Sequence, residues 1–252
     1  MNKPKISDFK SNYPIIKIKR NYTRLWRWLI IGRLGFFISW IAARLNISAN
    51  NITVLSFLFG LIGIYFLVQG KFIIGLIGIN FWYLFDCADG NLARYYKVKS
   101  KLGQFLDEAL GEIILTFMWF AIGIGLYKTP DLSIVICEDI KSIHLFFSGS
   151  FISVAIALRN CISFRFFSIH EKNKSNDIQN NTIKNPNPII KIAKFIWNTI
   201  TSFGGMQAPL LLMVASIDYL GLLVIFYSFL YGFYLFILTI YYIIKLNRLV
   251  FK

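Results

Sequence analysis

The sequence predicts an all-α, polytopic membrane protein. Of its 252 residues, 56% are hydrophobic and 17% aromatic, and the mean hydropathy is +0.59, which is too apolar for a soluble domain. Several continuous apolar runs reach the length of about 20 residues that a helix needs to cross a bilayer. Because a segment in lipid must satisfy its backbone hydrogen bonds internally, we expect these runs to be helices.

Six membrane spans follow from the apolar runs. They cover residues 52–69, 72–92, 103–127, 144–164, 192–217 and 220–244. Before them, "RLWRWLIIGRLGFFISWIAARLNIS" mixes aromatic residues with four arginines at near-helical spacing. This pattern favours an N-terminal interfacial amphipathic helix over a seventh span. We therefore divide the chain into a cytoplasmic and interfacial segment, residues 1–48, and a six-helix membrane domain, residues 49–252.

The distribution of positive charge predicts the orientation. Lys and Arg cluster before the first span, between the second and third, after the fourth and at the C-terminus, whereas the opposite loops hold only Lys71, Lys128 and Lys141. The positive-inside rule then places both termini in the cytoplasm. Basic flanks on an anionic membrane account for the net charge of +15, and we find no nucleic-acid-binding motif, so nucleic acid is not an expected partner.

Three aspartates interrupt the apolar pattern where the second span ends and the third begins. Asp86 and Asp89 start a helical stripe that continues with the small residues Gly90 and Ala93, and Asp107 lies between two glycines at i−4 and i+4. Ionisable groups at this depth are costly unless they are paired or bind metal, and few basic residues are near. The three carboxylates therefore predict a site for a hard cation.

The stretch "DCADGNLARYYKVKSKLGQFLD" resembles the signature of the CDP-alcohol phosphotransferase family, D-x2-D-G-x2-A-R-x8-G-x3-D-x3-D. The positions that match at the family's spacing are Asp86, Asp89, Gly90, Ala93, Arg94, Gly103 and Asp107. Upstream, "NISANNIT" is similar to the family's T-P-N-x-I/V-T in Asn50 and Thr53, with Ala49 in place of proline. Six spans with cytoplasmic termini are also similar to the family's core.

The resemblance implies a reaction in phospholipid or related biosynthesis. An alcohol attacks a CDP-linked donor, often CDP-diacylglycerol, to give a phosphodiester and CMP. Asp86, Asp89 and Asp107 would be the catalytic metal ligands for Mg²⁺ or Mn²⁺, as two ions. The residues assigned to substrate binding are Gly90, Ala93, Arg94 and Gly103. The resemblance also suggests a homodimer, surrounded by membrane lipids, with its active site facing the cytoplasm.

One position departs from the family pattern. The family's fourth aspartate, a metal ligand and the base that activates the acceptor, corresponds here to Gly111. Glu108 and Glu112 are near, but each lies about 100° around the helix from the Asp107 stripe. The alternatives are an alkoxide formed without a protein base, a base from another helix, an altered reaction such as slow hydrolysis, lost catalysis, or an introduced glycine.

Two functions therefore stay open. The first, which we favour, is an active membrane transferase; the second is a catalytically silent member that binds metal and CDP-lipid as a scaffold or subunit. A cation transporter explains the acids but not the Gly90, Ala93 and Arg94 spacing. The acceptor stays open among inositol phosphate, glycerol phosphate, serine, choline and a sugar alcohol.

Two further features have alternative interpretations. Arg159, inside the fourth span, either binds a phosphate of donor or acceptor, or is a structural partner for an acid or reaches to the interface. The glycine pair of "SFGGM", residues 202–206, indicates close helix packing or a break in the fifth span, and we favour packing.

Overall fold

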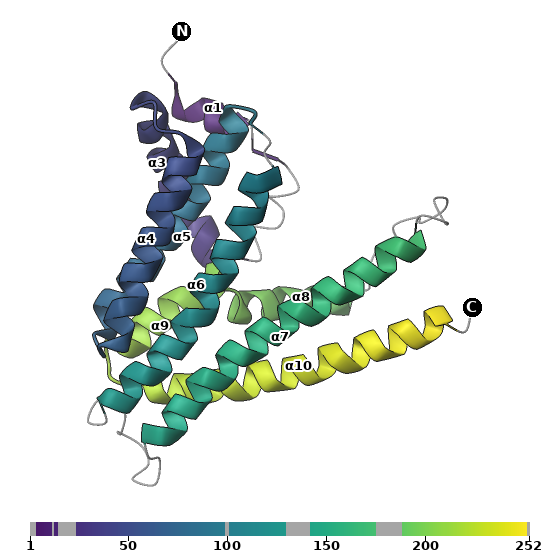
Figure 1. The fold of residues 1–252 in the computed structure, drawn as a ribbon. Coiled ribbons are helices and arrows are strands. Elements are labelled where there is room, and N and C mark those ends of the chain that lie inside the picture. Colours follow the sequence, from purple (N-terminus) through teal and green to yellow (C-terminus); the bar gives the residue numbers. More distant parts are fainter. Residues whose placement is uncertain are drawn as a thin grey trace.

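The computed structural model describes residues 4–11, 13–14, 24–98, 101–129, 142–174 and 188–250, which are almost entirely helical and contain no strand (Figure 1). The elements are α1 (Ile6–Ser11), the π-helix η1 (Arg27–Ile31), α3 (Gly32–Arg44), α4 (Ala49–Val68), α5 (Phe72–Tyr95), α6 (Lys101–Lys128), α7 (Ser142–Lys174), α8 (Pro188–Thr201), the π-helix η3 (Phe203–Gln207), α9 (Ala208–Ala215) and α10 (Leu220–Val250).

Within the described residues, five helices are long and apolar enough to cross a membrane. Their spans are Ala49–Val68, Phe72–Tyr95, Phe105–Lys128, Ser142–Phe164 and Leu220–Lys245. Each agrees within three residues with one of the predicted spans. An all-helical, integral membrane protein is thereby confirmed, whereas the count of six spans is not.

The predicted fifth span, 192–217, is not one continuous helix. α8 ends at Thr201, η3 follows, and α9 is only eight residues long. The backbone at Gly205 is non-helical, with φ −80° and ψ −115°, and a Cβ there would collide with the carbonyl oxygens of Asn198 and Thr199. Only glycine fits this bend. Favouring packing over a break at "SFGGM" was therefore wrong, although Gly204 does pack closely against the Tyr83 hydroxyl.

Helices α4, α5 and α6 form a bundle in which α4 packs along both neighbours. Gly63 of α4 lies against Gly75 and Gly78 of α5, and a Cβ at Gly78 would lie 2.8 Å from the Gly63 Cα. Small residues of this kind let helix backbones approach, which is the main source of packing where lipid removes the hydrophobic driving force. The close α4–α5 contact holds α4 in a fixed relation to α5, the helix that carries Asp86 and Asp89.

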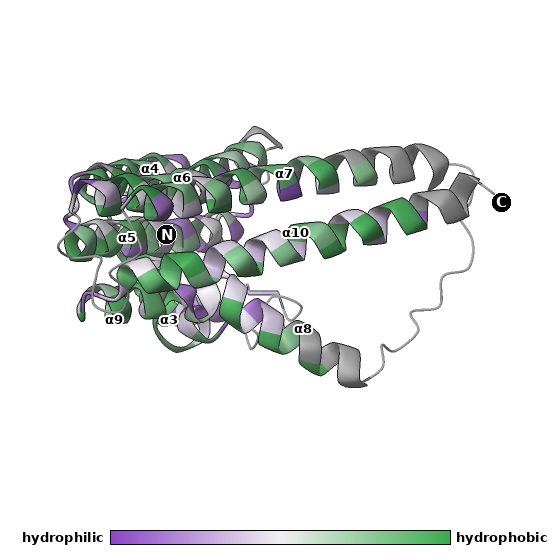
Figure 2. Cartoon of the chain, turned by 90° about the horizontal axis from the view of Figure 1, so that it is seen from below, coloured by the Kyte–Doolittle hydropathy of each residue, from purple (hydrophilic) through white to green (hydrophobic). Residues whose placement is uncertain are grey.

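The two longest helices, α7 and α10, pack on each other and run obliquely out of the bundle (Figures 1 and 2). At the bundle end, Trp119 of α6 packs on Tyr227 of α10 with ring centroids 5.2 Å apart. Figure 2 shows that much of the described part of both helices is hydrophobic, and some of these residues are exposed, among them Phe229 at 76%. Such faces are stable in lipid rather than in water, which agrees with the spans.

The segment for which the sequence predicts an N-terminal amphipathic helix is helical, as η1 followed by α3, and its amphipathic, interfacial character stays a prediction. Its small residues face the protein: Gly35, Ser39, Ala42 and Ala43 are buried, and the Ser39 hydroxyl lies 3.0 Å from the Ala88 carbonyl oxygen of α5. Large apolar side chains on its other face are exposed. Its position in the membrane interface stays a prediction, but its packing places the N-terminal segment beside the aspartates of α5.

Candidate functional site

Asp86 and Asp89 lie in the last turns of α5. Asp89 is only 4% exposed, and its Oδ2 accepts a 2.6 Å hydrogen bond from the Thr53 hydroxyl. Thr53 is in the first turns of α4, whose start is fixed by the Ser48 cap: the Ser48 hydroxyl accepts from the Asn51 backbone N–H at 3.2 Å. The "NISANNIT" stretch therefore holds one of the acids of the aspartate motif.

Asp107 approaches Asp86 from α6. Both Asp107 and Asp89 are close enough to act electrostatically on Asp86. Asp86 is half-buried and Asp107 is exposed. The three aspartates therefore lie within electrostatic range of one another, near the end of α5 and the start of α6.

The donor set suits a hard cation, because carboxylate oxygens are the ligands that Mg²⁺ and Mn²⁺ prefer. The positions of these carboxylates fit a metal site less well than their chemical type does. Among the residues that the structure describes, no group of three or more acidic, histidine or cysteine side chains is positioned to hold a metal ion. Asp89 instead directs one oxygen to Thr53. The residues therefore fit the implied metal in kind, whereas their carboxylates do not form one cluster within the described structure.

Arg94 lies over Gly90 at the end of α5. A Cβ at Gly90 would be 3.3 Å from Arg94 Nη1, so the glycine makes room for the guanidinium. Nη2 donates to Asn91 Oδ1 at 2.7 Å, and the guanidinium carbon is 5.1 Å from the ring centroid of Tyr13. Among the described residues, Nε is buried and has no hydrogen-bond partner. A charged donor is therefore held in place and left unused.

Ala93 lines a pocket of 310 Å³ between the loop after α3 and the end of α5. Its other lining residues are Asn46, Ile47, Ser48, Ala49, Asn50, Tyr96 and Val98. The volume is at the lower end of the range of small-molecule sites, about 300–1,000 Å³. The small side chain of Ala93, which directly precedes Arg94 and lies one turn from Asp89, keeps this pocket open.

The glycines of α6 differ in their surroundings. Gly103 is in the first turn of the helix and is half-buried. At Gly111, a Cβ would meet only Trp82, at 3.9 Å from Cζ2, which is ordinary van der Waals contact. The position of the family's fourth aspartate therefore has room for a side chain.

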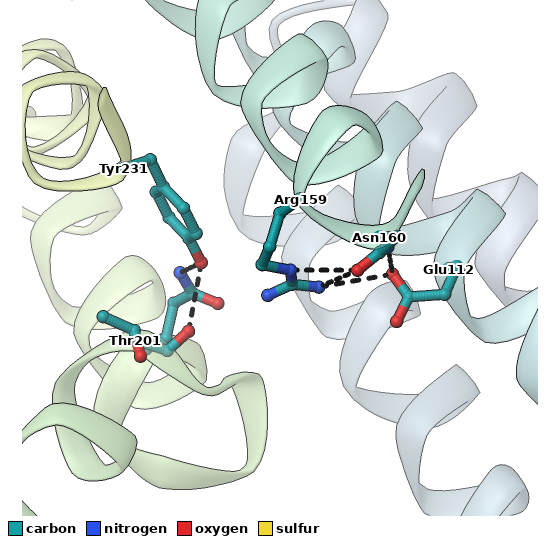
Figure 3. Close-up of polar contacts among 6 residues, drawn as sticks. Glu112, Arg159, Asn160, Thr201 and Tyr231 are labelled. Atoms are coloured by element: carbon teal, nitrogen blue, oxygen red, sulfur yellow. Dashed lines mark hydrogen bonds and ion pairs between the residues drawn. The ribbon is translucent and has the colours of Figure 1, made fainter. Parts of the chain in front are cut away.

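Glu112 points to α7 (Figure 3). Its Oε2 lies 3.6 Å from Arg159 Nη2 and accepts a short hydrogen bond from the Asn160 side-chain amide. Arg159 Nε and Nη2 also donate to Asn160 Oδ1, at 2.9 and 2.7 Å. Of the interpretations of Arg159, the structure favours a structural partner for an acid, and the acid is Glu112 rather than one of the aspartates.

Across from this group, Figure 3 shows Tyr231 and Thr201. The Tyr231 hydroxyl donates to the Thr201 carbonyl oxygen at 3.0 Å and accepts from the Gln207 side chain at 3.1 Å. These bonds attach the bend after α8 to α10. Because Gln207 is in η3, they also satisfy polar groups where the chain breaks its helix.

Sequence reasoning missed the contributions of the N-terminal segment to this site. Tyr13 stacks on Arg94, and the Arg27 guanidinium is 5.8 Å from the Tyr83 ring centroid and close enough for Asp86 to act on it electrostatically. The sequence marked Arg27 only as a basic residue among aromatics. No periodicity links residue 27 to a helix more than 50 residues later.

Comparison with models of protein families matches residues 46–240 to the family described as CDP-alcohol phosphatidyltransferase. The match covers most of the chain, from the loop before α4 into α10, and includes all three aspartates. No curated protein matches the chain at a significant level.

Proposed function

Because the chain belongs to the CDP-alcohol phosphatidyltransferase family, we propose that it transfers a substituted phosphate, a phosphatidyl group, from a CDP-linked lipid donor to an alcohol and releases CMP. The observation that carries the proposal is the meeting of Asp86, Asp89 and Asp107 beside the unused Arg94 donor. An anionic donor with two phosphates matches this combination, since it needs charge neutralisation as well as a directional hydrogen-bond donor.

The donor would lie along the end of α5. The pocket beside Ala93 takes the cytidine, and Gly90 allows the phosphates to approach the helix backbone. Arg94 binds a phosphate oxygen through its free Nε, since a guanidinium matches phosphate geometry. The resemblance gives Gly103 a place at the same site, where α6 begins beside the donor.

Asp86, Asp89 and Asp107 would hold Mg²⁺ or Mn²⁺. When bound, the metal neutralises the diphosphate charge and stabilises the leaving group. Thr53 orients the Asp89 carboxylate through its 2.6 Å hydrogen bond. The proposal also includes two metal ions, a cytoplasmic active site and a homodimer. These parts rest on the family resemblance and on the charge distribution.

The acceptor hydroxyl would enter on the side of Gly111, where the structure leaves space beside Trp82. Glu112 is held by Arg159 and Asn160, so it is not free to take the acceptor's proton. This observation also favours a second candidate function, a silent member that binds metal and CDP-lipid without transferring it. The acceptor stays open among the polyols, amino alcohols and their phosphates.

The experiment that tests the proposal is CMP release by the purified full-length chain in lipid nanodiscs. CDP-diacylglycerol and Mg²⁺ are supplied with a panel of acceptor alcohols, and Asp89→Asn is the control for background hydrolysis. Acceptor-dependent CMP release that the control lacks is the expected result. CDP-lipid binding without release for any acceptor would support the silent member, and absence of both would contradict the proposed site.

A further inference from the structure

The N-terminal segment is fixed against α5 at two points, one on each side of Asp86. Trp26 Nε1 donates to Asn80 Oδ1 at 3.0 Å, and the Ser39 hydroxyl lies 3.0 Å from the Ala88 carbonyl oxygen. The backbone between these anchors therefore has little freedom relative to the helix. Arg27 follows the first anchor directly, so its side chain is delivered to a defined stretch of α5.

Arg27 begins the π-helical turn η1. Its guanidinium carbon is 5.8 Å from the ring centroid of Tyr83, and Asp86 is close enough for each group to act electrostatically on the other. A π-helical turn is a rare geometry that is common at functional sites. Gly32 accommodates the turn, since a Cβ there would lie 2.7 Å from the Arg27 carbonyl oxygen.

Within the described part of the chain, the guanidinium of Arg27 forms no hydrogen bond or ion pair, although it is only half exposed. A guanidinium has five N–H donors. Arg159, by comparison, is paired with Glu112 and Asn160. Arg27 is thus positioned beside the acidic site without forming an ion pair to a described residue of it.

A second guanidinium lies further along the same helix. Arg94 and Arg27 are near enough to repel each other electrostatically, and Arg94 Nε is buried with no partner. Gly90 lies between Asp86 and Arg94, one turn from each, and has no side chain to cover the helix surface. Two neighbouring like charges with unused donors are stabilised by an anion that contacts both.

We propose that Arg27 is a phosphate-binding residue of the donor site, which contacts the second phosphate of the nucleoside diphosphate while Arg94 contacts the first. The order follows from α5: the pocket at Ala93 is beside Arg94, and Arg27 is beside Tyr83 and Asp86. This inference rests on the proposed function, because the ligand is its donor.

In this role Arg27 also compensates for the carboxylate that is absent at Gly111. A site that lacks one carboxylate binds divalent cations less strongly, so less positive charge is available to the diphosphate. A guanidinium fixed beside Asp86 adds permanent positive charge at the same place, and it needs no carboxylate to hold it. The N-terminal segment thereby becomes part of the donor site.

Equilibrium binding of CDP and of CMP to the purified full-length chain, with Mg²⁺ and in chelator, tests the assignment. Arg27→Gln should weaken CDP binding by about 10- to 100-fold, the worth of a charge-assisted hydrogen bond, and should leave CMP binding nearly unchanged. Arg94→Gln should weaken the binding of both nucleotides. Arg33→Gln is the matched control, since Arg33 is exposed in the same segment and its loss changes the net charge equally.

Equal CDP binding by Arg27→Gln and Arg33→Gln would overturn the inference, as would an equal loss of CDP and CMP binding. If Arg27→Gln does not fold, Arg27→Lys is measured in its place. It should weaken CDP binding by a smaller factor and leave CMP binding unchanged. CDP binding that is not weakened in Arg27→Lys would overturn the assignment. Failure of the proposed function is a separate outcome: the native chain then discriminates CDP through Arg27 but releases no CMP from CDP-diacylglycerol with any acceptor.

Discussion

Replacing Gly111 with aspartate should raise CMP release, because the new carboxylate would lie one helical turn beyond Asp107 on the same stripe. The structure allows the side chain: the nearest atom to a Cβ at this position is Trp82 Cζ2, at 3.9 Å, so no neighbour has to move. The neighbouring acid cannot already do this work, since Glu112 is engaged by Arg159 and Asn160.

The expected gain is large. A positioned general base contributes about 10²–10⁴-fold to a rate, so we expect at least the lower end of this range even with imperfect geometry. Metal affinity should rise as well, because a further carboxylate oxygen joins the site. Gly111→Asn separates these effects from size: it has nearly the same shape and cannot act as a base, so it should give little or no gain.

The assay is CMP release from CDP-diacylglycerol with the panel of acceptor alcohols. It compares the unsubstituted chain with four variants: Gly111→Asp, Gly111→Asn, Glu108→Gln and Glu112→Gln. One pattern would refute the idea that the missing carboxylate limits the rate. In it, the unsubstituted chain is active, neither glutamine substitution changes the activity, and Gly111→Asp abolishes it. That pattern would show a pocket remodelled around a bare backbone, with a base supplied elsewhere or with none.

Three more predictions concern the donor site and the topology. Affinity for a CDP-linked donor should fall sharply in chelator and in Asp86→Asn, measured by equilibrium binding; undiminished binding by metal-free protein would contradict the metal site. Thr53→Val removes the 2.6 Å bond to buried Asp89, so the folded state should lose about 1–3 kcal/mol in reversible unfolding, whereas Thr53→Ser should lose less. Cysteine labelling should place both termini and segment 167–191 in the cytoplasm. This segment runs from the end of α7 to the start of α8, and its residues 175–187 lie outside the described structure. Labelling of the segment from outside intact cells would contradict the predicted topology.

Local patterns were enough for the features that depend on neighbouring residues. Five apolar runs of sufficient length are five long helices, because a helix in lipid is specified by run length and composition. The stripe of Asp86, Asp89, Gly90 and Ala93 is a direct consequence of helical spacing. The resemblance of the aspartate motif to its family was read from the same few residues, and the family match agrees with it.

The break in the fifth predicted span shows the limit of run length. Residues 192–217 are apolar enough to suggest one helix, and hydrophobicity carries no information about backbone angles. The backbone at Gly205 is non-helical. Only a residue without a Cβ tolerates this bend, because a Cβ would collide with the carbonyl oxygens of Asn198 and Thr199. A glycine pair permits this bend but does not require it, since glycine serves close packing equally well.

The sequence by itself determined the fold class, the family and the carboxylates of the site, because composition and fixed spacing along one helix specify all three. Only the tertiary structure decided the partners of each charge: Arg159 pairs with Glu112, Thr53 holds Asp89, and Arg27 comes to lie beside Asp86. These contacts join helices that are dozens of residues apart. Their energies depend on distance, direction and burial, and spacing along the chain encodes none of these.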